Sequence, residues 1–199
     1  MWEGHKALPC TEREEMKYKH VYGQERKRMR WAAFDYSLQG VYFVTIVTKN
    51  RTCLFGDVVD GEMLLNDAGR MIQEQFLHLE QSMDGLECMD FVVMPNHFHA
   101  LVNINKESII DLPLVMKNFK GITTNFYTKG VKDYGWSRFD GTLWQKGYWD
   151  DIVWNRRMFE FIQHYIYLNP SRWNRDRVNV NHDAETDDIR GALDRLRMI

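Results

Sequence analysis

The chain has 199 residues, 44% of them hydrophobic, and a formal net charge of −2 that by itself indicates no particular partner. This composition suits one globular domain with a substantial core and an appended tail. No apolar stretch reaches the roughly 18 residues that span a bilayer, and the N-terminus lacks the apolar region of a secretory signal. The three cysteines are far apart and lack CxxC spacing. They exclude a disulfide framework or a zinc knuckle and favour free thiols in a reducing, cytoplasmic location.

A basic segment lies near the N-terminus. Residues 17–30 contain six basic side chains and one glutamate, interleaved with two tyrosines. Such a segment can grip a phosphate backbone, or it can be a solvated arm. The candidate DNA-binding side chains here are Lys17, Lys19, Arg26, Lys27, Arg28 and Arg30.

The first predicted elements are strands followed by a helix. Residues 42–48 are apolar or β-branched on both faces, which predicts a strand covered on both sides. Residues 53–65 predict a hairpin that turns at Asp60-Gly61. Asn66 then predicts the N-cap of a helix, because the apolar residues from Ala68 to Leu79 recur at about 3.6 residues.

The second half repeats this alternation. An apolar run at residues 92–102 predicts a strand, Asp111 opens a helix that ends about Gly130, and residues 141–153 are predicted to be extended. A last clear helix runs from about Asn155 to Leu168 and ends at a proline, with an apparent further helix in the C-terminal tail. This order predicts an α+β, ferredoxin-like or RRM-like fold, with helices on an antiparallel sheet.

The apolar run 92–102, VVMPNHFHALV, contains two histidines one residue apart. Successive side chains of a strand point to opposite faces, so His97 and His99 share one face. Two imidazoles on a rigid strand can hold one metal ion, or they can simply lie at a wet edge of a sheet.

The last predicted helix carries a second candidate pair. Tyr165 and Asn169 are four residues apart and therefore lie on the same helical face. A phenol can act as a nucleophile, and a carboxamide oxygen can bind metal. The same spacing also fits a plain amphipathic helix in which Tyr165 is a core aromatic and Asn169 only ends the helix.

These motifs together resemble a known family. MPNHFHALV at residues 94–102, LWQKGYWD at 143–150 and YIYLNP at 165–170, in this order, are similar to the single-tyrosine HUH transposases. The closest resemblance is to REP-associated tyrosine transposases and related insertion-sequence transposases, over about residues 30–172. Histidine-triad hydrolases also use alternating histidines, but Leu101 stands where their third histidine would be.

The resemblance implies a role for each motif. His97 and His99 match the metal-binding pair, Tyr165 the nucleophile, and Asn169 the amide that completes the metal site. The expected ion is Mg²⁺ or Mn²⁺. Because these three ligands are neutral, we expect weak binding that a DNA phosphate oxygen completes. Tyr167 lies about 200° round the helix from Tyr165 and is the less suitable nucleophile.

The implied activity is cleavage and rejoining of single-stranded DNA beside a hairpin through a 5′-phosphotyrosine. The expected partners are single-stranded or hairpin DNA from palindromic repeats, with no membrane, and the protein is a monomer or a homodimer. Tyr148 and Trp149 either pack in the fold or stack on DNA. A hairpin-binding protein that no longer cuts, and a replication-initiator or relaxase-type nickase, remain alternatives. The predicted division is a basic arm at 1–30, the transposase domain at 31–175 and a tail at 176–199.

Overall fold

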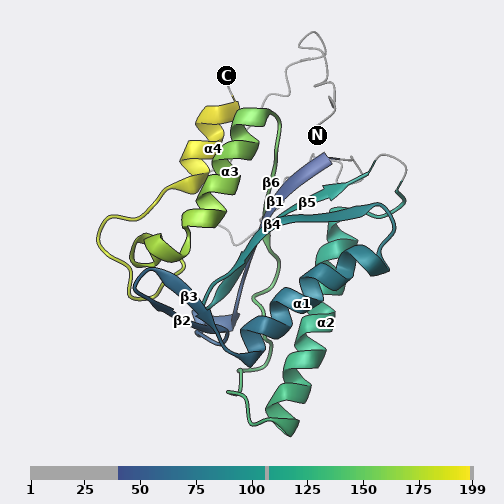
Figure 1. Cartoon of the computed structure of the whole chain (residues 1–199), viewed down its shortest axis with the longest axis vertical. Coiled ribbons are helices and arrows are strands. Elements are labelled where there is room, and N and C mark those ends of the chain that lie inside the picture. The colour runs from purple at the N-terminus through teal and green to yellow at the C-terminus, as the bar shows by residue number, and fades with distance from the viewer. Residues whose placement is uncertain (1–39, 106–107, 198–199) are drawn as a thin grey trace.

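A four-stranded antiparallel sheet lies at the centre of the computed structural model, which describes residues 40–105 and 108–197 (Figure 1). The strand order is β4-β5-β1-β6, and all three neighbouring pairs are antiparallel. This order, with a helix after the first and third strands, is the ferredoxin-like arrangement predicted from the sequence. The strands are β1 (Gly40–Val47), β4 (Leu86–Val93), β5 (His97–Ile104) and β6 (Trp149–Ile152).

Helices cover both faces of the sheet (Figure 1). The first face packs against α1 and α2, and the second against α3 and α4. A short hairpin stands apart from the sheet, between β1 and α1. These elements are α1 (Asp67–Ser82), α2 (Leu112–Asp133), α3 (Arg156–Leu168), α4 (Ile189–Arg197), the hairpin strands β2 (Gly56–Val59) and β3 (Glu62–Leu65), and the 3₁₀ segments η2 (Lys49–Arg51) and η3 (Pro170–Arg175).

Strand alternation divides the core into two parts. Along β5, Phe98 and Ala100 face α1 and α2, whereas Leu101 faces α3. Along β1, Tyr42 and Phe43 divide in the same way. Because both faces are covered, most residues of these two strands are buried, which explains the continuous apolar runs in the sequence. His97 and His99 consequently lie on the α3 side of the sheet.

Three polar side chains begin the three long helices. Asn66 accepts a hydrogen bond from the Gly69 amide, Asp111 from the Leu114 amide, and Asn155 from the Met158 amide. Each satisfies one of the backbone N–H groups that a helix leaves unpaired at its N-terminus. The helix starts predicted at these residues are confirmed, as is the hairpin turn at Asp60-Gly61.

Two expectations differ from the structure. The run 92–102 is not one strand, because the chain turns at residues 94–96 between β4 and β5. Pro95 has no N–H to add to a sheet, and its carbonyl accepts from the Leu54 and Phe55 amides instead. The segment 141–153 is a strand only from Trp149 to Ile152. None of the helices in the described part of the chain is long and apolar enough to span a membrane.

Candidate active site

Strand β5 holds two imidazoles against each other beneath α3. His97 and His99 have ring centroids 4.5 Å apart, and their residues are 0% and 3% exposed. Phe43, on the neighbouring strand, stacks on His99, and Trp173 of η3 stacks on His97. The pair is therefore enclosed, and the alternative of a wet sheet edge is wrong.

Each imidazole is oriented through its Nδ1 atom. His97 Nδ1 lies 3.0 Å from the Asn96 side-chain oxygen, and His99 Nδ1 lies 2.7 Å from the Thr45 hydroxyl. An amide oxygen only accepts, so Nδ1–H of His97 donates to Asn96 and its Nε2 keeps a lone pair when the ring is neutral. Metal-binding histidines usually have a hydrogen-bond partner on one ring nitrogen, which directs the other nitrogen toward the metal.

Helix α3 brings the phenol and the carboxamide to the same place. The Tyr165 hydroxyl lies 3.4 Å from His99 Nε2, and its ring packs edge-on against Phe43. Asn169, at the end of α3, is buried with 2% of its surface exposed. Tyr167, by contrast, is 81% exposed, and His164 is also exposed. The structure therefore places Tyr165, and not Tyr167, beside the histidines.

Asp176 completes this cluster, although it is not among the residues predicted from the sequence. It is buried, with Oδ2 3.4 Å from His97 Nε2 and 3.5 Å from the Asn169 amide nitrogen. Its other oxygen accepts a hydrogen bond from the Val178 amide, which fixes the carboxylate. Asp176 follows η3, just beyond the predicted boundary at residue 175, and no local pattern distinguishes it from the other acidic residues of the tail.

The cluster has the character of a metal site. His97, His99 and Asp176 each offer a ligand atom, and these atoms lie within 4.8 Å of one another. His97 Nε2 and the Asn169 side-chain oxygen are buried with no hydrogen-bond partner. Buried polar atoms are normally paired, so two orphaned acceptors beside a carboxylate indicate that a cation belongs there. The carboxylate also makes this ligand set anionic, unlike the neutral set expected from the sequence.

Burial sets the protonation of the site. It lowers the pKa of His97, against the raising effects of Asp176 and Asn169, and it lowers that of His99 well below its usual value, with His97 adding to the shift. Both imidazoles are thus neutral and free to bind metal at neutral pH. Burial also raises the pKa of the Tyr165 phenol, and the negative charge of Asp176 raises it further.

The remaining predicted residues divide in two. Tyr148 is 3% exposed and packs in the core against α1 and α2, while Trp149 packs edge-on against Phe43. The burial of Tyr148 and the contact of the half-buried Trp149 with Phe43 favour packing over DNA stacking. The basic arm, with its six candidate cations, lies outside the described residues.

Comparisons with known proteins give the family. A family model described as "Transposase IS200 like" matches residues 37–169. An uncharacterized protein of Haemophilus influenzae (strain ATCC 51907 / DSM 11121 / KW20 / Rd) is 28% identical over 171 residues, covering 78% of this chain and 94% of that protein.

Two solved structures are similar to this chain, and the first of them supports the fold. A REP-associated tyrosine transposase, described as bound to a REP hairpin, is similar with a TM-score of 0.54 and 18% identity, over 72% of this chain and 74% of that one. A putative transposase from Deinococcus radiodurans has a TM-score of 0.43 and 21% identity, over 69% of this chain and 95% of that one. Since the family match spans more than half of the chain, through Asn169, this protein belongs to the IS200-like transposase family.

Proposed function

We propose that this transposase cuts and rejoins single-stranded DNA beside a hairpin, with Tyr165 as the nucleophile. The observation that carries the proposal is the convergence of the Tyr165 hydroxyl, His99 Nε2 and the orphaned acceptors of His97 and Asn169 in one enclosed cluster. A core tyrosine alone would not need buried ligand atoms beside its hydroxyl. The preference for hairpins is supported by the similar fold of the transposase described as bound to a REP hairpin.

The reaction exchanges one phosphodiester for another. The Tyr165 oxygen attacks the scissile phosphorus and loses its proton, so that a phosphorus–oxygen bond to tyrosine forms. The bond to the 3′ oxygen of the preceding nucleotide breaks, and that oxygen takes up a proton and leaves as a 3′-hydroxyl. The DNA end remains as a 5′-phosphotyrosine, and the 3′-hydroxyl of another strand can reverse the step without ATP.

A divalent ion, Mg²⁺ or Mn²⁺, fits the cluster, with His97, His99, Asn169 and Asp176 as the residues that would hold it. When bound, it would neutralise charge on the scissile phosphate and favour the phenolate. Two imidazoles favour Mn²⁺ over Mg²⁺, whereas the Asp176 carboxylate and the Asn169 oxygen suit both ions. We propose Asp176 as the ligand that makes binding possible before DNA arrives.

Tyr165 needs nearby positive charge to react. Its phenol pKa is raised by burial and by Asp176, so at neutral pH it is a phenol in the metal-free protein. Neutralising Asp176 with a cation removes one cause of that rise. Arg172 also acts to lower the Tyr165 pKa. Ionisation of the Tyr165 phenol therefore depends on whether a cation occupies the ligand cluster.

Exposed arginines around the cluster can bind the DNA backbone. Arg172 and Arg175 lie on η3, where Asp187 contacts both at 3.8 and 3.2 Å. Arg51 and Arg177 are joined by a hydrogen bond from the Arg51 guanidinium to the Arg177 carbonyl. Arg172, Arg175 and Arg177 flank Asp176 in the chain and the Arg51 guanidinium lies at the Arg177 carbonyl, and phosphates bind arginine well. The basic arm at 17–30 stays a prediction as a further backbone contact.

The test is capture of the covalent adduct. The wild-type protein with Mn²⁺ and a hairpin oligonucleotide, labelled on the 3′ side of its cut site, should give a labelled band on a denaturing protein gel. Tyr165→Phe should abolish the band, and Tyr167→Phe, the matched control on the same helix, should retain it. An adduct that persists in Tyr165→Phe would refute the assignment.

A native gel beside the denaturing one tests the non-cutting alternative. A hairpin-binding protein that no longer cuts would retard the oligonucleotide on the native gel but give no adduct on the denaturing gel with any metal. A nickase of the replication-initiator or relaxase type would form the same adduct, because the tyrosine chemistry is the same, and would differ in the DNA that it cuts. Short imperfect palindromes that flank the gene would favour the transposase.

A further inference from the structure

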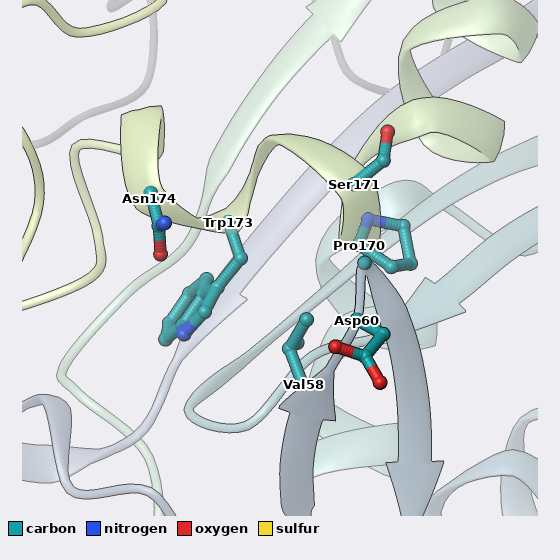
Figure 2. A pocket seen from close by; sticks show the side chains of 7 residues that line it. Val58, Asp60, Pro170, Ser171, Trp173 and Asn174 are labelled. Atoms are coloured by element: carbon teal, nitrogen blue, oxygen red, sulfur yellow. The ribbon is translucent and has the colours of Figure 1, made fainter.

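A small pocket lies next to the active site, between the β2–β3 hairpin and η3 (Figure 2). Its volume is about 230 Å³. Drug-sized ligands occupy sites of about 300–1,000 Å³, so this pocket suits a single small planar group. Figure 2 shows Trp173 and Asn174 on one side of it and Val58 and Asp60 of the hairpin on the other; the full lining is Val58, Asp60, Gly61, Pro170, Ser171, Trp173 and Asn174.

Trp173 connects the pocket to the reaction centre. Its indole stacks on His97, with ring centroids 5.9 Å apart and an interplanar angle of 30°, and it also lines the pocket. Pro170 follows Asn169 directly, so the pocket begins where the ligand cluster ends. A group in the pocket would therefore be a near neighbour of a phosphate held at the cluster.

The chemistry of the lining selects the occupant. Among the described residues, no lysine or arginine lines the pocket, and the Asp60 carboxylate would repel a phosphate. An indole and a proline ring offer flat apolar surface, while the Asn174 amide and the Asp60 carboxylate offer polar edges. Aromatic stacking with nearby polar edges is how proteins hold unpaired bases, and the arginines that suit phosphates lie outside.

We infer that this pocket binds one unpaired nucleobase of the DNA flank, adjacent to the scissile phosphate, by stacking on Trp173. This inference rests on the proposed function, because it takes the DNA strand to the Tyr165 cluster. Asp60 accepts a hydrogen bond from an exocyclic amino group, so the pocket prefers cytosine, adenine or guanine over thymine, which has no such group.

The hairpin turn is built to present Asp60. Asp60 and Gly61 both have positive φ, 52° and 81°, as in a two-residue type I′ turn. The Gly61 backbone lies against Ser171, so the tip of the hairpin rests on η3. Asparagine is also favoured in this backbone conformation, so Asp60→Asn removes the charge without straining the turn.

The experiment measures binding of hairpin oligonucleotides with single-stranded dC, dA or dT flanks to full-length protein. All variants carry Tyr165→Phe, which prevents cutting. EDTA keeps metal out, so that a Trp173 variant cannot change DNA binding by disturbing His97 as a metal ligand. An abasic site is moved through the flank, and 2-aminopurine at the same positions reports stacking. At one position, base removal should weaken binding about tenfold and 2-aminopurine should be quenched.

Trp173 variants decide whether the pocket causes this effect. Trp173→Leu should abolish both the abasic penalty and the quenching at that position, and Trp173→Phe should keep most of the penalty. Asp60→Asn should reduce an about fivefold preference for dC or dA over dT flanks. Glu62 is an exposed acidic residue on the hairpin face opposite Val58, so Glu62→Gln is the control and should leave this base preference unchanged.

The outcomes separate this inference from the proposed function. The base pocket would be overturned if removing a base weakened binding at no flank position, or if it weakened binding equally in Trp173→Leu. In that case an adduct formed by the wild type would still support the cleavage proposal. Conversely, a Trp173-dependent penalty without any adduct in the wild type would support the pocket in a protein that binds hairpins but does not cut.

Discussion

Asp176→Asn tests the negatively charged ligand of the proposed metal site. The replacement is nearly isosteric, and its side-chain oxygen can keep the hydrogen bond from the Val178 amide. It removes one negative charge from a buried position 3.4 Å from His97 Nε2. We expect weaker Mn²⁺ binding with the fold retained.

The magnitude follows from the Coulomb attraction between the carboxylate and the ion. One negative charge about 4 Å from a divalent cation interacts by about 2 kcal/mol in water and about 8 kcal/mol at an effective dielectric constant of about 20. Part of this is offset because the carboxylate and the ion both lose water. The loss should therefore be at least about 1.4 kcal/mol, which is tenfold or more in affinity.

Calorimetric titration of Mn²⁺ into wild type, Asp176→Asn and Asp183→Asn measures it. Asp183 is an exposed acidic residue of the same tail and should bind like wild type when replaced. Without metal, Asp176→Asn should unfold at the same or a higher temperature, because a buried anion beside an imidazole lone pair is removed. Equal Mn²⁺ affinity in wild type and Asp176→Asn would refute the role of Asp176 as a ligand.

Three further expectations test the site and the fold. In metal-free protein the pKa values of His97 and His99 are lowered, so below about pH 6.5 the unfolded chain binds more protons than the folded one. Each histidine should therefore reduce the free energy of unfolding by up to about 1.4 kcal/mol per pH unit as the pH falls. In urea unfolding, His99→Gln should reduce the slope of this free energy against pH by one proton, and an unchanged slope would contradict the pKa shift. Asn66→Ala should cost about 1 kcal/mol by loss of the α1 cap, measured in the same way, whereas no loss would mean that water replaces it. Neutralising Lys27 and Arg28 should weaken DNA binding for all sequences and flatten the salt dependence by roughly 0.7 per lost single-strand phosphate contact; an unchanged slope would assign the arm to solvated surface.

Short-range patterns in the sequence predicted much of the secondary structure and the pairing of the site residues. The period of two along residues 97–99 puts both histidines on one face of a strand, and the four-residue spacing puts Tyr165 and Asn169 on one face of a helix. Asn66, with the apolar pattern after it, marks the start of α1 because a cap acts within one turn. Such signals depend only on neighbours in the chain.

The tertiary structure decided what no local pattern contains. Asp176 reaches His97 only because the chain turns back after η3, so its role depends on contact between residues 79 positions apart. The turn at Pro95 was hidden within an apolar run because β5 is buried along almost its whole length, and a strand that is buried on both faces lacks the polar alternation that would mark it. The base pocket, likewise, exists only where the hairpin tip rests on η3. Packing between distant segments, which has no period in the sequence, completed the site.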